Sequence, residues 1–265
     1  MKINIAGGTG VMGKVHRPVF ENMGHEVIFS GRLTSPNLEE ASQISDLTIV
    51  SVPIPVTEEV IKRVAPYSRA LMDFTGLKVF PVQAMLKYSK DGCEVGGLHP
   101  LYGDVKSLEG RTVVYCPTNK SGNKCEMVID AFQKSGLKIK RMDLQSHDTL
   151  VGGISQNARS IIFEAFALLM ERSGISAGEL YEISPPPTRI LLDLMARQAD
   201  GKNDELYQAM REYNPSTSQI TQYLTDALSS TSRKDVPQRI RNLFGDDLLK
   251  EAQSRAKTLI ERTTS

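Results

Sequence analysis

The sequence predicts an α/β domain over residues 1–148 and an all-helical domain over residues 149–265. Three observations support this division. Short apolar runs alternate with helical stretches in the first part, which is typical of a parallel sheet covered on both faces. A glycine-rich loop follows the first of these runs directly. Beyond residue 148 the pattern changes to long stretches with the 3.6-residue period of helices.

The first domain is expected to contain five strands in short apolar runs, followed by two more strand-like runs. The expected strands are Lys2–Ala6, Glu26–Phe29, Leu47–Val52, Ala70–Phe74, Glu94–Leu98, Arg111–Cys116 and Lys138–Met142. Helical segments are expected between the first four strands, and a further helix near Lys124–Ser135.

The second domain is expected to contain five helices. They are Val151–Arg172, Pro187–Ala199, Asp204–Tyr213, Ser218–Ser229 and Asp246–Arg262. The first of them is too apolar to face solvent in a monomer. We therefore expect a homodimer formed through this domain.

Composition excludes several classes of protein. The 265 residues carry a formal net charge of +1, and neither half has the basic excess of a nucleic-acid-binding protein. Apolar runs are far shorter than the ~20 residues that span a bilayer. The first strand is expected at Lys2, which leaves no room for a signal peptide. Three cysteines without metal-ligand spacing predict no metal site. We expect a cytoplasmic protein with no membrane or nucleic-acid partner.

The glycine-rich loop predicts a cofactor site. It lies between the first strand and the helix after it, which is the context that a dinucleotide-binding motif requires. The motif is Gly8, Thr9, Gly10, Val11, Met12 and Gly13. The first glycine is expected to allow a tight turn, the second to admit a pyrophosphate, and the third to let the helix approach the strand. This favours a Rossmann domain over the alternative, a turn without a ligand.

The end of the second strand bears on the choice of cofactor. NAD sites present an acidic residue there, whereas this chain has Ser30 and Arg32, which suit the 2′-phosphate of NADP. The alternative is that Arg32 is a surface charge and that NAD binds. Val52 and Pro53, after the third strand, are expected to border the nicotinamide, although an ordinary strand-to-helix turn is equally consistent with them.

His99 is the candidate catalytic residue. It ends the fifth strand, where ligands bind such sheets, and a neutral imidazole can accept a hydroxyl proton. The alternative is a hydrogen-bonded loop histidine. His16 and His25 are expected to be structural or exposed.

Several motifs together resemble the prephenate and arogenate dehydrogenases of tyrosine biosynthesis, above all the dehydrogenase portion of the bifunctional T-protein. Besides the glycine loop, the matching segments are Asp46–Ile54, Val56–Glu58, Pro81–Leu86, Gly97–Pro100, His147–Asp148 and Thr188–Ile190. The resemblance covers nearly the whole chain.

The resemblance implies the oxidative decarboxylation of a cyclohexadienyl acid, prephenate or arogenate, with NADP or NAD. His99 would accept the proton of the ring 4-hydroxyl while hydride leaves C4 and CO2 leaves C1, which makes the ring aromatic. Arg189 would hold a substrate carboxylate with two parallel donors. We interpret His147 as a structural residue between the domains.

Two positions depart from the family pattern. Gly76 stands where the family has a serine that orients the catalytic histidine, and the adjacent Thr75 is a candidate replacement. Arg159 stands at or beside a substrate-site histidine. Ser155 lies one helical turn earlier on the same face, and Gln156 follows it, so these polar residues are candidates for substrate binding. The alternative for Arg159 is a partly exposed position at a domain interface.

The departures leave other functions open. A 4-amino substrate needs no base at the ring substituent, because the nitrogen lone pair can expel hydride. A 4-amino-4-deoxyprephenate dehydrogenase, which makes 4-aminophenylpyruvate, is therefore the second hypothesis. The others are an oxidoreductase of the β-hydroxyacid dehydrogenase or imine reductase type, and a non-catalytic NADP-binding protein.

Overall fold

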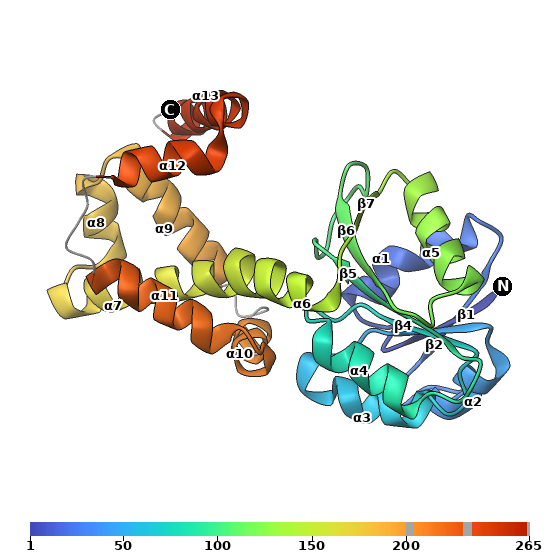
Figure 1. The fold of residues 1–265 in the computed structure, drawn as a ribbon. Helices are drawn as coiled ribbons and strands as arrows, with labels where there is room; N and C mark the ends of the chain where they lie inside the picture. The colour runs from blue at the N-terminus through green and yellow to red at the C-terminus, as the bar shows by residue number, and fades with distance from the viewer. Residues whose placement is uncertain (200–203, 230–234, 264–265) are drawn as a thin grey trace. The chain divides into compact units, whose positions relative to one another are not determined.

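A computed structural model describes residues 1–199, 204–229 and 235–263 (Figure 1). The chain divides into two compact units. The α/β unit consists of Met1–Gln156 together with Gln208–Thr217, and the helical unit consists of Asn157–Tyr207 and Ser218–Ser265. A late segment of the chain thus returns to the first unit. The domain boundary near residue 148 stays a prediction.

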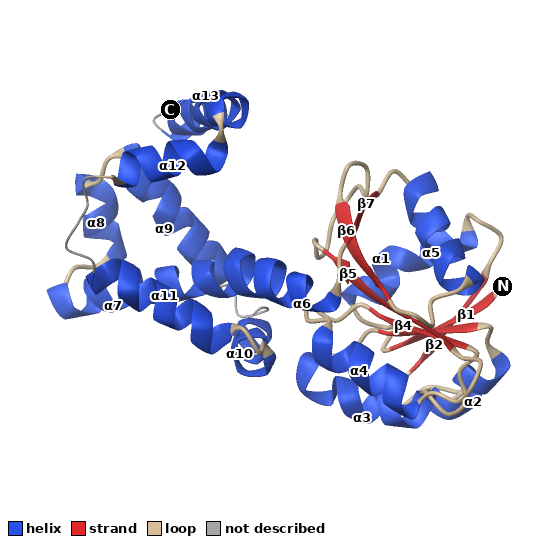
Figure 2. Ribbon diagram, in the orientation of Figure 1, coloured by secondary structure: helices blue, strands red, loops and turns tan. Residues whose placement is uncertain are grey.

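The α/β unit is built on one seven-stranded sheet with the order β2-β1-β3-β4-β5-β6-β7 (Figure 2). The strands are β1 (Lys2–Ala6), β2 (Glu26–Ser30), β3 (Leu47–Val50), β4 (Ala70–Asp73), β5 (Glu94–Pro100), β6 (Thr112–Pro117) and β7 (Lys138–Arg141). All neighbours are parallel except β5 and β6, which the sequence pattern did not distinguish. The Rossmann-like fold class is confirmed.

Helices cover both faces of the sheet (Figure 1). On one face lie α1 (Val11–Glu21) and α5 (Asn123–Lys134). The other face carries α2 (Leu38–Ile44), α3 (Ile54–Val64) and α4 (Val79–Tyr88). Helix α4, between β4 and β5, was not among the expected helices.

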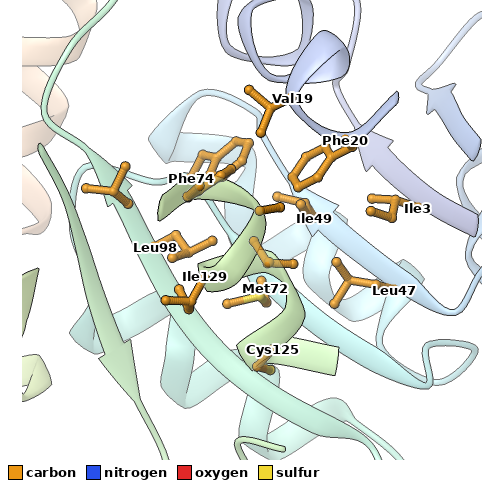
Figure 3. Packing of buried hydrophobic residues seen from close by; sticks show 14 of the residues in the cluster. Ile3, Val19, Phe20, Leu47, Ile49, Met72, Phe74, Leu98, Cys125 and Ile129 are labelled. Atoms are coloured by element: carbon orange, nitrogen blue, oxygen red, sulfur yellow. The ribbon is translucent and has the colours of Figure 1, made fainter. Parts of the chain in front are cut away.

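The main core lies between the sheet and the first of these helical layers. Ile49 and Leu98 from the sheet pack with Phe20 of α1 and Ile129 of α5 (Figure 3). Each such side chain contributes ~1.5–3 kcal/mol when fully buried. This packing fixes the sheet, so the loops at the carboxyl ends of its strands have a rigid base.

The strand order reverses between β1 and β3, and such a point is where open α/β sheets bind ligands. The glycine loop follows β1, and Val52 follows β3. A Cβ atom built at Gly7 would lie 2.8 Å from Cγ1 of Val52, so the two loops are adjacent.

After the sheet, the chain is helical. The remaining elements are α6 (Leu144–His147), η1 (Asp148–Ala158), α7 (Arg159–Ser173), α8 (Ala177–Ile183), α9 (Pro186–Gln198), α10 (Asp204–Tyr213), α11 (Thr217–Ser229), α12 (Val236–Phe244) and α13 (Asp246–Thr263). In the described part of the chain, no helix combines the length and apolar character needed to cross a membrane.

The expected single helix Val151–Arg172 is wrong in its first part. Residues Asp148–Ala158 form wide π-helical turns, and the regular α-helix begins only at Arg159. At Gly152 a Cβ atom would lie 2.7 Å from Nδ2 of Asn214, so the returning segment packs tightly against these turns.

Candidate active site

The glycine loop has the backbone geometry of a close turn. Gly7 has a φ of +86°, a conformation that strongly favours glycine. The turn therefore depends on Gly7, whereas we expected it to depend on Gly8. Gly8 is instead required for packing, because its Cβ atom would lie 2.3 Å from the Phe29 ring. A Cβ atom at Gly13 would lie 2.0 Å from the carbonyl oxygen of Gly8, so Gly13 lets α1 approach the loop.

The N-terminus of α1 fits an anionic group. Gly10 is the N-cap and offers no side chain to the first turn, which also contains no acidic residue. A Cβ atom at Gly10 would approach only the carbonyl oxygen of Gly7, at 3.3 Å. The first-turn N–H groups have no partner within the helix, and the helix dipole favours negative charge there. Thr9 and Val11 are exposed beside this end, and Met12 is half-buried. These features fit the pyrophosphate of a dinucleotide.

The structure places the two cofactor-selecting candidates differently. Ser30 is fully buried, and its hydroxyl donates to Oδ1 of Asn4 at 2.8 Å. Contrary to our expectation, its side chain is therefore not available to a 2′-phosphate. Arg32 is exposed in the loop after β2. Pro53 is exposed after β3, where Val52 is half-buried.

A buried chain of three side chains ends at His99. Nδ1 of His147 lies 2.8 Å from Oδ1 of Asp148, and Nε2 of His147 lies 2.9 Å from Nδ1 of His99. His147 and Asp148 are fully buried, and His99 is 7% exposed. Because His99 belongs to β5 and the other two lie where α6 meets η1, three elements meet at this point.

Asp148 also holds the loop after β4. Its two carboxylate oxygens accept hydrogen bonds from the backbone N–H groups of Lys78 (2.7 Å) and Val79 (2.9 Å). The Lys78 ammonium forms a buried ion pair with Asp73 and donates to the carbonyl oxygen of Leu98 at 2.7 Å. Lys78 thus links Leu98, the residue before His99, to Asp73 at the end of β4.

Burial keeps both histidines neutral. It lowers the pKa of His99 well below the ordinary value of 6.5, and the charges of His147 and Lys78 lower it further. Burial also lowers the pKa of His147, although the hydrogen bond to Asp148 opposes this shift. A neutral His99 can accept a proton at neutral pH.

Gly76 and Met210 lie next to His99. A Cβ atom at Gly76 would lie 2.7 Å from Sδ of Met210 and 3.7 Å from Nε2 of His99. Met210 comes from the returning segment Gln208–Thr217, which is also anchored by a 2.9 Å hydrogen bond from Asn214 to the carbonyl oxygen of Asp148. No residue in the described ranges hydrogen-bonds Nε2 of His99.

Thr75 precedes Gly76, but its hydroxyl makes no hydrogen bond to His99. Its backbone N–H donates to Oδ2 of Asp73 at 2.9 Å. Its side chain is buried, and the hydroxyl has no hydrogen-bond partner among the described residues. Ser155 is exposed and Gln156 is half-buried, both on η1 of the α/β unit.

The candidate carboxylate-binding arginines belong to the helical unit. Nη2 of Arg159 donates to the Tyr207 hydroxyl at 3.3 Å. Nε of Arg189 donates to the carbonyl oxygens of Tyr181 and Ser184, each at 3.1 Å. These bonds fix the Arg189 guanidinium at the turn between α8 and α9. The guanidinium also lies over the Tyr181 ring, 5.8 Å from its centroid, and its terminal nitrogens have no hydrogen-bond partner among the residues that the structure describes.

Comparison with known proteins shows which family the chain resembles. Residues 24–141 match the model for the prephenate dehydrogenase nucleotide-binding domain. A probable arogenate/prephenate dehydrogenase of Methanocaldococcus jannaschii is 28% identical over 278 residues, which cover 97% of this chain and 60% of that protein. The chain is therefore similar to the prephenate dehydrogenase family over nearly its whole length, and residues 24–141 carry the nucleotide-binding domain of that family. This similarity favours a prephenate dehydrogenase-type enzyme over the β-hydroxyacid dehydrogenase or imine reductase hypothesis.

Two further relatives carry different names. The T-protein of Haemophilus influenzae is 30% identical over 74% of this chain and 52% of its own length. A 4-amino-4-deoxyprephenate dehydrogenase of Streptomyces pristinaespiralis is 26% identical over 69% of this chain and 62% of its own length. The chain therefore spans between half and two thirds of the length of these relatives.

A solved structure of the prephenate dehydrogenase family shares the fold. The Aquifex aeolicus prephenate dehydrogenase, in complex with hydroxyphenyl propionate and NAD+, matches with a TM-score of 0.67 at 17% identity. The match covers 98% of each chain.

Sequence reasoning missed the partners of His99. His147 was interpreted as a structural residue between the domains, yet it contacts His99 directly. Lys78 and Met210 were not singled out at all. The sequence signal that was available is the pairing of His147 with Asp148, an imidazole next to a carboxylate.

Proposed function

We propose that this protein catalyses the NAD(P)-dependent oxidative decarboxylation of a prephenate-like cyclohexadienyl acid, prephenate or arogenate. The observation that carries the proposal is His99, a buried neutral imidazole whose Nε2 has no hydrogen-bond partner among the residues that the structure describes. It lies in the α/β unit that also carries the dinucleotide-type glycine loop. The similarity to prephenate dehydrogenases supports the same reaction class.

The residues of the chain supply the proton chemistry and the binding. Nε2 of His99 takes the proton of the ring 4-hydroxyl. The electron pair of that O–H bond then forms a second bond between the oxygen and C4 as hydride leaves C4. The bound nicotinamide supplies the hydride acceptor. Loss of CO2 from C1 returns an electron pair to the ring, which becomes a phenol. A general base of this kind contributes ~100- to 10,000-fold to the rate.

We propose Arg189 as the main ligand of a substrate carboxylate. Its guanidinium is held by two backbone carbonyl oxygens through Nε, which leaves the terminal nitrogens for a bidentate contact. Arg159, supported by Tyr207, is proposed as a second carboxylate ligand, and Ser155, Gln156 and Thr75 as polar neighbours of the substrate.

We propose NADP as the preferred cofactor, bound at the glycine loop and bordered by Val52 and Pro53. The support is Arg32, which is exposed after β2, where NAD-binding proteins carry an acidic residue. Replacing Arg32 by glutamate is then expected to raise the KM for NADP+ much more than that for NAD+.

The 4-amino analogue of prephenate is the second candidate substrate. A specific observation favours it: Gly76 places no hydroxyl beside Nε2 of His99, and Met210 fills the adjacent space. The Streptomyces relative is named for this substrate.

We propose that the helical unit forms a homodimer. In its described residues three large hydrophobic side chains are buried: Phe163, Leu192 and Ile220. Many others are exposed, among them Leu169 (62%), Ile183 (74%) and Leu243 (84%). A cavity of about 580 Å³ between α7, α8 and α9 is lined mostly by apolar residues. Such a surface is typical of a contact with another protein. Light scattering during gel filtration is expected to give twice the monomer mass.

The deciding experiment follows absorbance at 340 nm with purified protein, NADP+ or NAD+, and each candidate acid. Reduction with prephenate or arogenate is the expected result. Reduction with only 4-amino-4-deoxyprephenate would replace the first substrate by the second. If none of the three acids is oxidised while NADP+ still binds, the proposed activity is wrong.

A further inference from the structure

The hydrogen-bond chain from Asp148 to His99 determines where the protons lie. The Asp148 carboxylate already accepts from two backbone N–H groups, so toward His147 it acts as an acceptor as well. Nδ1 of His147 therefore carries the hydrogen of that 2.8 Å bond.

The same reasoning continues to His99. A neutral imidazole has one N–H and one lone pair, so Nε2 of His147 must accept. The 2.9 Å bond then requires a hydrogen on Nδ1 of His99, and Nε2 of His99 keeps its lone pair. Burial, which lowers the pKa of His147, is consistent with the neutral form on which this argument depends.

We propose that His147, held by Asp148, is a positioning residue that keeps His99 in the tautomer with a free Nε2. This inference rests on the proposed function, because it assigns Nε2 as the atom that takes the substrate proton.

No other described contact selects this tautomer. Gly76 has no side chain, and the atom nearest to its Cβ position is the thioether sulfur of Met210, which has no hydrogen to donate. A free histidine side chain favours the opposite tautomer, with hydrogen on Nε2, and that form cannot accept a proton there. The selection therefore depends on the contact at Nδ1.

The chain of groups also stabilises the charge that forms. When the proton moves from the substrate hydroxyl to Nε2, His99 becomes an imidazolium and keeps its Nδ1–H bond to His147. The Asp148 carboxylate at the far end compensates the positive charge through the polarised His147 ring. Because these three side chains are buried, this interaction is stronger than it would be in solution.

Nitrogen-15 NMR of the histidine side chains tests the tautomer without any turnover. The chain has four histidines, and two act as internal references. His16 bonds the Met12 carbonyl oxygen through Nδ1 (2.8 Å), so it should carry hydrogen on Nδ1. His25 accepts from the N-terminal ammonium at Nδ1 (3.2 Å), so it should carry hydrogen on Nε2. We expect His99 and His147 to match His16. Hydrogen on Nε2 of His99 in the wild-type protein would overturn the proposal.

A pair of variants tests the effect on the reaction. In His147→Gln the side-chain oxygen can still accept from Nδ1 of His99, whereas His147→Leu removes the acceptor. We expect His147→Leu to lower kcat by ~10- to 100-fold with little change in KM, less than the loss of a general base itself. We expect His147→Gln to recover most of that loss, and the His99 signal to change tautomer only in His147→Leu.

The two proposals fail in different ways. A wild-type protein that oxidises none of the candidate acids refutes the proposed function, and the NMR spectrum alone then decides the tautomer. An active wild type with equal kcat in both His147 variants, or with an unchanged His99 tautomer in His147→Leu, refutes the positioning role.

Discussion

His99 combines burial with a free Nε2, and each property has its own test. His99→Asn preserves side-chain polarity but removes the proton acceptor. We expect kcat to fall by ~100- to 10,000-fold. The affinity for NADP+, measured by isothermal titration calorimetry, should stay within about threefold because the glycine loop is untouched. Full activity in this variant would remove His99 from the mechanism.

The pH dependence of the reaction follows from the direction of the His99 shift. Its pKa is lowered mainly by burial, and the base works only when neutral. The neutral form therefore persists below pH 6.5. We expect the acidic limb of kcat/KM, measured with saturating cofactor, to have its midpoint below pH 6.5. A midpoint at or above that value would contradict the burial of the base.

Arg189 tests carboxylate recognition. In Arg189→Lys a planar pair of donors becomes a single point charge, so bidentate binding is lost. We expect the substrate KM to rise by at least about tenfold, while the KM for the cofactor changes little. Arg172→Lys, an exposed position on α7, is the matched control and should leave both constants unchanged. Parallel losses for substrate and cofactor would indicate a folding defect in Arg189→Lys instead.

At the scale of elements, the loop before α4 and the end of α10 are fitted to each other. A Cβ atom at Gly76 would lie 2.7 Å from Sδ of Met210, which is 1% exposed. We expect Gly76→Ala to lower the free energy of unfolding by ~1–3 kcal/mol through overpacking. In a Met210→Ala background the same change should cost almost nothing, because the methyl group enters vacated space. Urea unfolding of the four proteins measures this cycle. An equal cost in both backgrounds would contradict the contact.

Most elements of the α/β unit are predictable from the sequence because most of its strands are short apolar runs between turn residues. The elements that the sequence did not predict have physical explanations. Periodicity shows which face of a helix is apolar but not the spacing of its hydrogen bonds, so the π-helical turns of Asp148–Ala158 were expected to be α-helical. Helix α8 is short and was missed, although its Ser176–Glu179 capping box is a sequence signal.

The residues of the candidate site are predictable only where a short stretch of sequence identifies them. The glycine loop and His99 each stand at the end of a strand, so a local pattern identifies them. The contact between His99 and His147 joins residues 48 positions apart, and the approach of Met210 to Gly76 joins still more distant ones. No local sequence pattern indicates contacts between residues so far apart in the chain. Ser30 shows the opposite error, because a hydroxyl at a strand end can turn inward to a neighbour such as Asn4.

For the molecule as a whole, buried histidines make stability depend on pH. Burial lowers the pKa of His16 to about 4, whereas an unfolded histidine titrates near 6.5. Between these values the unfolded chain binds a proton that the folded chain does not, so stability falls as pH drops. His16 alone should cost about 2 kcal/mol at pH 5 relative to pH 8.

Urea unfolding of wild type and His16→Gln between pH 5 and pH 8 isolates this contribution, because the other titrating groups are common to both proteins. We expect the two stabilities to converge as the pH falls. A constant difference between them would show that folding leaves the pKa of His16 unchanged.

The segment Gln208–Thr217 belongs to the α/β unit although the chain on both sides of it belongs to the helical unit. During synthesis on the ribosome the sheet and its glycine loop emerge early, but Met210 and Asn214 do not. The packing of Met210 beside His99 and the hydrogen bond from Asn214 to Asp148 can form only after residue 217 has cleared the exit tunnel. A nascent chain that stops at residue 156 would therefore present a folded sheet with the surroundings of His99 unfinished, and oxidising activity should emerge only with the later part of the chain.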